Sequence, residues 1–160
     1  MERIEKQMQF ILEIDKEKQI QRKTLQSNGK NFEDDAQHAW HMAIMTLLLS
    51  EYANEEIDVL KTISMLLIHD LVEIDAGDTY AYDDQGLQTQ NKREALAANR
   101  IFNLLPEDQA KKVFDLWNEL KNRCSLFWKL IKRNKLKEKH FKAMDKILRM
   151  MLNMPGIWLL

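Results

Sequence analysis

The 160-residue chain has few glycines, prolines and cysteines, and each shortage excludes a class of protein. Its four Gly and two Pro make up under 4% of the residues, whereas average usage is about 12%. β-Sandwiches and Rossmann units need more turn residues and phosphate-loop glycines than that. The one cysteine, Cys124, excludes an internal disulfide and a zinc site built from thiolates, and it fits a reducing compartment.

Long apolar runs are also missing. No uncharged apolar run approaches the ~20 residues of a membrane span, and the charged residues 1–6 lack the apolar core of a signal peptide. With 45% apolar and 31% charged residues, the composition is that of a globular protein rather than a disordered one. We therefore expect a single domain over residues 1–160 that is cytoplasmic and has no membrane partner.

Charge is distributed unevenly along the chain. Residues 123–160 carry ten Lys or Arg and only two acids, whereas the first 122 residues are net negative. A basic tail is a candidate for binding nucleic acid or an acidic membrane. Because it has little aromatic interleaving beyond Phe127 and Trp128, we interpret it as a solvated helix that balances an acidic body, and we expect no nucleic-acid partner.

Apolar residues recur at helical spacing along most of the chain, and sustained period-two alternation is missing, which predicts an all-α fold. The expected helices cover residues 2–25, 36–53, about 56–68, 90–105, a segment after Pro106, and 138–153, with polar loops at 30–35 and 77–86. In the second of these helices the expected buried stripe is Trp40, Ala43, Ile44, Leu47 and Leu48.

The adjacent pair His69-Asp70 closes a very apolar segment, where two polar side chains are costly to bury without partners. A metal ion would remove that cost, because neutral imidazole and carboxylate are both good ligands for divalent first-row metals. A buried His–Asp hydrogen bond is the alternative interpretation. His38 begins another apolar helix, and Glu73 lies one helical turn after His69, so that both project from one side.

Asp145 is a further candidate ligand. It stands in the middle of the predicted helix 138–153, next to Met144 on that helix's apolar face. Aspartate is unfavourable inside helices and is usually found at caps, so its position here indicates a side chain that faces inward.

Three strings of residues together resemble the HD-domain metal-dependent phosphohydrolases, and within them the 5'-deoxynucleotidase-like branch. The resemblance covers roughly residues 5–153, and the middle string is the most specific because Glu and Gly-Asp follow the His-Asp pair at fixed spacing. The strings are Asp35-Ala36-Gln37-His38-Ala39-Trp40-His41, Leu67-Ile68-His69-Asp70-Leu71-Val72-Glu73-Ile74-Asp75-Ala76-Gly77-Asp78-Thr79 and Ala143-Met144-Asp145-Lys146.

The resemblance implies an HD-domain helical bundle with a metal site between core helices, commonly as a homodimer. It implies one divalent transition metal ion (Mn, Co, Zn, Fe or Ni) and a small nucleotide substrate. The implied metal ligands are His38, His69, Asp70 and Asp145, and the implied catalytic residues are Glu73 and Asp78. The implied phosphate contact is Arg22, with Lys23 and Lys30 as the other candidates.

Such a ligand set leaves open positions on the metal for water and a phosphoryl oxygen. The metal lowers the pKa of bound water from about 15.7 toward 7, and no Ser or Cys nucleophile triad is evident in the sequence. We therefore expect a phosphomonoesterase that hydrolyses nucleoside, and in particular deoxyribonucleoside, 5'-monophosphates by attack of metal-bound water. His41, three residues after His38, is either a packed helix residue or a further polar group at the metal.

The chain departs from the family pattern in places. Gln37 stands where the family usually has Glu before the first ligand His, the segment 123–140 is basic and atypical, and only a short tail, 154–160, follows the last predicted helix. Two alternatives remain for the function: a non-hydrolytic HD module that binds a nucleotide, a metal or a protein partner, and an HD hydrolase of another nucleotide phosphate.

Overall fold

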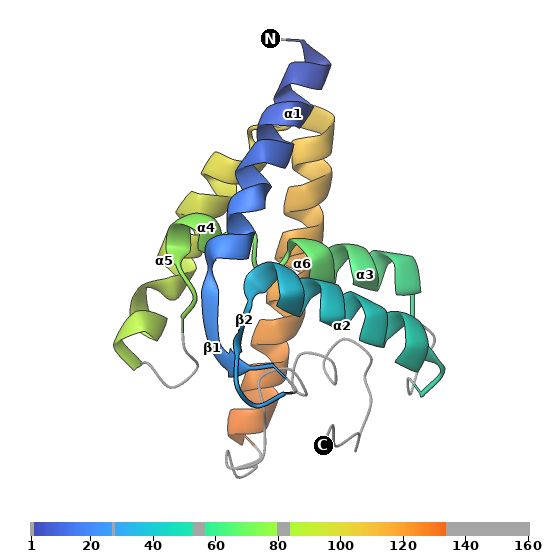
Figure 1. The fold of residues 1–160 in the computed structure, drawn as a ribbon, viewed down its shortest axis with the longest axis vertical. Helices are drawn as coiled ribbons and strands as arrows, with labels where there is room; N and C mark the ends of the chain where they lie inside the picture. Colours follow the sequence, from blue (N-terminus) through green and yellow to red (C-terminus); the bar gives the residue numbers. More distant parts are fainter. Residues whose placement is uncertain (1, 27, 53–56, 80–83, 134–160) are drawn as a thin grey trace.

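The structure, a computed structural model, describes residues 2–26, 28–52, 57–79 and 84–133 (Figure 1). Helices account for most of these residues, and a hairpin of two short strands accounts for the rest of the regular structure. In chain order the elements are α1 (Arg3–Ile14), the 3₁₀ turn η1 (Asp15–Gln19), β1 (Gln21–Leu25), β2 (Phe32–Asp34), α2 (Asp35–Leu49), the 3₁₀ turn η2 (Ser50–Tyr52), α3 (Val59–Ile68), α4 (Glu73–Ala76), α5 (Asp84–Phe102) and α6 (Glu107–Arg133).

The helices form two groups. α1, α5 and α6 run along the length of the molecule, and the pair α2–α3 lies across it (Figure 1). α2 packs along α3, while the single turn α4 packs against α5 and η1. This arrangement confirms the predicted all-α class, because the only β structure in the described residues is the small antiparallel hairpin β1–β2.

The hairpin corrects the prediction of one helix over residues 2–25 and of a loop at 30–35. The helix ends at Ile14 and is followed by the 3₁₀ turn η1. The backbone becomes extended at Ile20, and β1 then pairs with β2. The strand replaces the predicted helix for a physical reason. In the strand, Arg22 and Thr24 both point inward, and Thr24 donates a hydrogen bond to Glu33 at 2.7 Å. A helix through these residues would not direct alternate side chains to one face.

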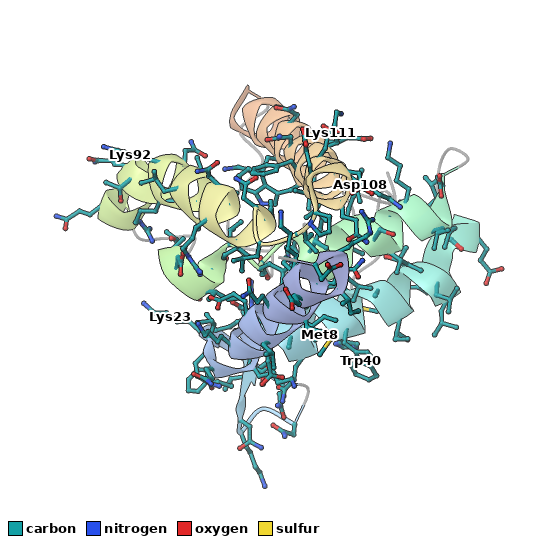
Figure 2. The ribbon with its side chains drawn as sticks, turned by 90° about the horizontal axis from the view of Figure 1, so that it is seen from above. Met8, Lys23, Trp40, Lys92, Asp108 and Lys111 are labelled. Atoms are coloured by element: carbon teal, nitrogen blue, oxygen red, sulfur yellow. The ribbon has the colours of Figure 1, made fainter. Side chains whose placement is uncertain are left out.

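The buried face of α2 is also different from the predicted stripe. Trp40 is 62% exposed and points outward (Figure 2), and Ile44, Leu47 and Leu48 are exposed as well, although Ala43 is buried as predicted. The face that packs inward carries His38, Ala39, Met42, Ala43, Met45 and Thr46. Because α2 is apolar nearly all round, periodicity could not select its inward face.

The main core lies between α4, α5 and α6. Phe102, fully buried at the end of α5, meets Phe114 and Trp117 of α6 edge-on, with ring centroids 5.0 and 6.1 Å apart. Edge-to-face pairs of this kind add to the stabilisation from burial. The cluster consists of Leu71, Val72, Ala76, Ala97, Ala98, Ile101, Phe102 and Trp117.

The last described helix is longer than the sequence indicated. α6 begins directly after Pro106, as predicted, and continues to Arg133, so that the first part of the basic segment is helical. The predicted helix 138–153, the candidate ligand Asp145 and the tail 154–160 lie outside the described residues. Within the described ranges, no helix is both long and apolar enough to cross a membrane.

Replacing Phe102 tests the core. Phe102→Ala should lower the free energy of unfolding by about 3–5 kcal/mol, because it removes a fully buried ring and leaves a cavity. Leu96→Ala is the matched control on the same helix, since Leu96 is 64% exposed, and it should change stability by less than about 0.5 kcal/mol. Urea denaturation followed by far-UV circular dichroism measures both, and equal losses would contradict this core.

Candidate metal centre

Three candidate ligands come from the ends of two packed helices. His38 lies in the first turn of α2, whose N-terminus is fixed by Asp34 accepting a hydrogen bond from the Gln37 amide at 2.8 Å. His69 is the C-cap of α3, and Asp70 follows it directly. One ligand atom from each of His38, His69 and Asp70 lies within 4.8 Å of the other two. We call these three residues the metal cluster.

The tautomer of His38 is fixed by a carboxylate. Its Nδ1 lies 3.1 Å from Oε1 of Glu33, so Nδ1 carries the proton and donates it to the carboxylate. The Nε2 atom then carries no proton and presents its lone pair, and it is buried with no hydrogen-bond partner. Burial is also the main cause that lowers the pKa of His38. A carboxylate that orients a neutral imidazole in this way is the usual support of a metal-ligating histidine.

His69 has the same arrangement with a different acceptor. Its Nδ1 donates to the carbonyl oxygen of Leu66 at 2.6 Å, so Nε2 is the nitrogen left to bind a metal. Nε2 lies 2.9 Å from Oδ2 of Asp70 without the alignment of a hydrogen bond; burial lowers the pKa of His69, but Asp70 outweighs it and that pKa is raised. Two imidazole nitrogens and a carboxylate face one another in a buried space, and a divalent cation, which would replace a proton held there, fits this donor set. The residues present therefore fit the metal that the sequence implied.

Arg22 lies beside the cluster. Its Nη1 donates to Oδ2 of Asp70 at 2.6 Å and to Oδ1 of Asp35 at 2.8 Å. Burial lowers the pKa of Arg22, but the neighbouring carboxylates outweigh it and the pKa is raised overall. Burial likewise raises the pKa of Asp70, but His69 and Arg22 outweigh it and hold that pKa well below its ordinary range. Arg22 and Asp70 are therefore both charged at neutral pH.

Glu73 lies in the same buried network, near enough to Asp70 and Asp35 for their charges to act on it. Burial, with the charges of Asp70 and Asp35, raises the pKa of Glu73 to about 11, and burial raises that of Asp35 to about 6. Oδ2 of Asp35 and Oε2 of Glu73 are both buried without a hydrogen-bond partner. Burial therefore favours a protonated Glu73 in the metal-free protein.

The sequence analysis missed three buried acids near the cluster: Glu17, Glu33 and Asp35. Asp35 is fully buried, and Glu33 and Glu17 are each only 7% exposed. The run Glu33-Asp34-Asp35 just before His38 was a signal for two of them, because consecutive acids seldom precede a buried helix without partners. Nothing in the local sequence distinguished Glu17, since it sits among charged residues and only the turn η1 directs it inward.

The structure places the other predicted site residues as follows. Asp78 follows α4 and is partly exposed, and its charge is near enough to add to the raised pKa of Glu73, of which burial is the main cause. Lys30 is exposed at the β1–β2 turn, and Lys23 points outward from β1 (Figure 2). The ring of His41 stacks on Trp40, with centroids 6.2 Å apart, and His41 is not part of the metal cluster.

Glu17 gives a pH-dependent stability prediction. Burial raises its pKa to about 7, while in the unfolded chain it remains near 4.5. Between pH 4.5 and 7 the folded protein keeps Glu17 protonated, whereas the unfolded chain loses the proton. The free energy of unfolding therefore falls as the pH rises from 4.5 to 7. Glu17→Gln should therefore stabilise metal-free protein on the order of 2 kcal/mol at pH 8 and little at pH 4.5.

Urea denaturation in EDTA at the two pH values measures this difference. Glu13→Gln is the control of opposite sign, because Lys16 and Arg100 lower the pKa of Glu13 and its removal should destabilise the protein more at pH 8. An equal gain for Glu17→Gln at both pH values would show that its proton is not held by the fold.

The metal cluster predicts stabilisation by added metal. Co²⁺ or Zn²⁺ at about one hundred times its Kd should raise the free energy of unfolding by about 2.7 kcal/mol, and His69→Ala should abolish that gain because it removes a ligand. His41→Ala is the matched control and should keep the gain. Thermal unfolding with and without metal measures it, and a full gain in His69→Ala would rule out this cluster as the binding site.

Comparisons with known proteins agree with this geometry. A family model for the HD domain matches residues 14–155. The human 5'-deoxynucleotidase HDDC2 is 27% identical over 106 residues, 66% of this chain and 50% of the human protein. The 5'-deoxynucleotidase HDDC2 of Dictyostelium discoideum is 34% identical over 92 residues, 54% of this chain and 48% of that protein. This chain thus spans about half the length of the curated relatives it matches.

A solved structure is also similar. It is the crystal structure of a predicted metal-dependent phosphohydrolase from Magnetospirillum magnetotacticum MS-1, with 48% sequence identity and a TM-score of 0.71, covering 76% of this chain and 60% of that one. The family model spans most of the chain, and its span includes every residue of the metal cluster. The chain therefore belongs to the HD domain family.

Proposed function

We propose that this protein is a metal-dependent phosphohydrolase that releases phosphate from nucleoside 5'-monophosphates. The observation that carries the proposal is a pair of buried imidazole nitrogens without hydrogen-bond partners, Nε2 of His38 and of His69, which lie with Asp70 beside a buried arginine. A site built only for stability would leave no imidazole nitrogen without a partner. The names of the similar proteins support the reaction class.

His38, His69 and Asp70 would hold the metal, and we propose Asp145 as a fourth ligand. A divalent transition metal bound there supplies a Lewis acid for the phosphate oxygens and an activated water. Glu33 holds the ring of His38 in its ligating tautomer, and the Leu66 carbonyl does the same for His69. The chain thus fixes both rings before any metal arrives.

Arg22 would bind the substrate phosphate. It is already at the cluster, held by Asp35 and Asp70 at 2.8 and 2.6 Å, and a guanidinium has five donors, enough for these carboxylates and for phosphate oxygens. The exposed position of Lys30 makes it the weaker candidate for this role. We keep Lys30 only as a surface cation that could attract an anionic substrate.

Glu73 would exchange a proton with the attacking water, and Asp78 would act at the leaving sugar. The raised pKa of Glu73, caused by burial and by the charges of Asp70 and Asp35, supports a carboxyl that holds a proton inside the site. Asp78 follows the positive-φ residue Gly77 at the end of α4, near enough to Glu73 for its charge to act on that carboxyl. A preference for deoxyribonucleotides is part of the proposal and is supported by the names of the curated relatives.

We also propose that two copies of the chain associate. The outward face of α2 presents Trp40, Ile44, Leu47 and Leu48 to solvent. Association would remove these side chains from water, and exposed apolar patches of this kind mark interaction surfaces.

The test is phosphate release from a panel of ribo- and deoxyribonucleoside monophosphates, with EDTA and with added Mn²⁺, Co²⁺, Zn²⁺ or Mg²⁺. We expect turnover that EDTA abolishes. Glu73→Gln keeps the shape but cannot exchange the proton, so kcat and kcat/KM should fall together by about 10²–10⁴-fold while metal stabilisation persists. If wild type and Glu73→Gln release phosphate at the same low rate on every substrate, the protein is a non-hydrolytic HD module instead.

A further inference from the structure

Arg93 lies on α5 where that helix packs against α4. Its side chain is partly buried and turns toward the end of α4, whereas the neighbouring Lys92 points away from the body (Figure 2). Asp78 comes two residues after the end of α4. Arg93 is not part of the metal cluster. It is also not among the ligand, catalytic or phosphate-binding residues that the resemblance to the HD-domain phosphohydrolases implied.

The guanidinium of Arg93 bonds to both sides of the dipeptide Gly77-Asp78. Nη1 donates to the carbonyl oxygen of Ala76, directly before the dipeptide. Nη2 donates to Oγ1 of Thr79, directly after it, at 2.7 Å. Nη2 is also 3.4 Å from the carbonyl oxygen of Gly86, in the first turn of α5. One side chain therefore holds the residues on either side of the dipeptide Gly77-Asp78, namely Ala76 and Thr79.

The turn depends on this clamp because its own backbone is permissive. Gly77 has φ +72°, a conformation that L side chains rarely adopt, and its amide closes α4 by donating to the Glu73 carbonyl at 2.7 Å. Beyond that bond, the direction in which Asp78 leaves the helix is set by what holds Ala76 and Thr79. A planar guanidinium with two donating nitrogens suits this task better than a lysine, which is a point charge.

We propose that Arg93 is a positioning residue that aims Asp78 at the substrate. The inference rests on the proposed function, in which Asp78 acts at the sugar. A carboxylate that must meet a sugar hydroxyl has to be placed to within a fraction of an ångström, and the contacts of Arg93 with Ala76 before the Gly77-Asp78 dipeptide and Thr79 after it provide that placement. Arg93 itself does not touch the substrate in this proposal.

Arg100 on the same helix offers a matched control. It makes a comparable set of bonds, to both oxygens of Asp75 and to Oε1 of Glu13 at 2.7 Å, yet none of these partners belongs to the proposed site. Replacing either arginine by glutamine removes one charge and several hydrogen bonds from α5. A purely structural role for Arg93 would make the two variants behave alike.

The experiment compares Arg93→Gln with Arg100→Gln on deoxynucleoside and ribonucleoside monophosphates. Arg93→Gln should lower kcat/KM by about 10- to 100-fold and should shrink the ratio between the best deoxy substrate and its ribo counterpart. The kcat/KM of Arg100→Gln should stay within about threefold of the wild-type value when both are measured at a temperature at which the variant is folded. Co²⁺ stabilisation should be unchanged in both, because neither variant alters the metal cluster.

A double-mutant cycle separates positioning from direct action. If Arg93 acts through Asp78, then Arg93→Gln should add little to the loss already caused by Asp78→Asn. Thr79→Val is the milder variant, because it removes one acceptor of the clamp and keeps the arginine. Thr79→Val should also lower kcat/KM, by a smaller factor than Arg93→Gln. If Arg93→Gln does not fold, Thr79→Val tests whether the contact between Arg93 and Thr79 positions Asp78. Additive losses, or equal losses in Arg93→Gln and Arg100→Gln, would overturn the proposal.

The failure of the proposed function can be told apart from the failure of this inference. If wild type releases no phosphate from any substrate, the phosphohydrolase proposal fails. The role of Arg93 is then decided by equilibrium binding of deoxythymidine monophosphate to Co²⁺-loaded protein. Weaker binding in Arg93→Gln alone would support the clamp, and equal binding in the wild type and both arginine variants would overturn it.

Discussion

The site is organised by an excess of negative charge that the fold buries in one place. Glu33, Asp35, Asp70 and Glu73 are all at least nine-tenths buried, and Arg22 is the cation that contacts two of them directly. Buried carboxylates are tolerated only when a cation, a hydrogen-bond donor or a proton offsets each charge. The proton on Glu73, the His38 donor to Glu33 and the guanidinium of Arg22 each offset part of the excess. A divalent cation at the cluster would offset the remainder.

This constraint explains why a helical chain contains a hairpin. Asp35 begins α2 and Asp70 follows the end of α3, and Arg22 reaches both carboxylates as an inward-facing residue of β1. The same strand places Thr24 on Glu33, which in turn fixes the His38 ring. The short sheet is thus the element that links the phosphate-binding candidate to the metal ligands.

The sequence predicted the helical class, the helices around the core and the meeting of His38, His69 and Asp70, since local periodicity and the spacing of the motif carry that information. It did not predict the end of α1 at Ile14, because residues 15–25 keep good helix formers and only the distant partners of Arg22 favour a strand. It misplaced Trp40 because an all-apolar helix gives no preferred face. It overlooked Asp35 because the run Glu33-Asp34-Asp35 does not show which of its acids is buried until the partner Arg22 is located.

The attachment of α1 has a consequence for how the site responds to its medium. α1 has no fully buried residue, but its Phe10 and Ile14 pack partly buried against the core, and the ion pairs Arg3–Asp108 and Arg100–Glu13 also join it to α6 and α5. Added salt screens exposed ion pairs and leaves apolar packing in place. Since η1 and β1 continue directly from α1, the two apolar side chains keep the start of the hairpin in position when the ion pairs are weakened. The metal cluster is therefore insulated from ionic strength by a helix that contributes no ligand.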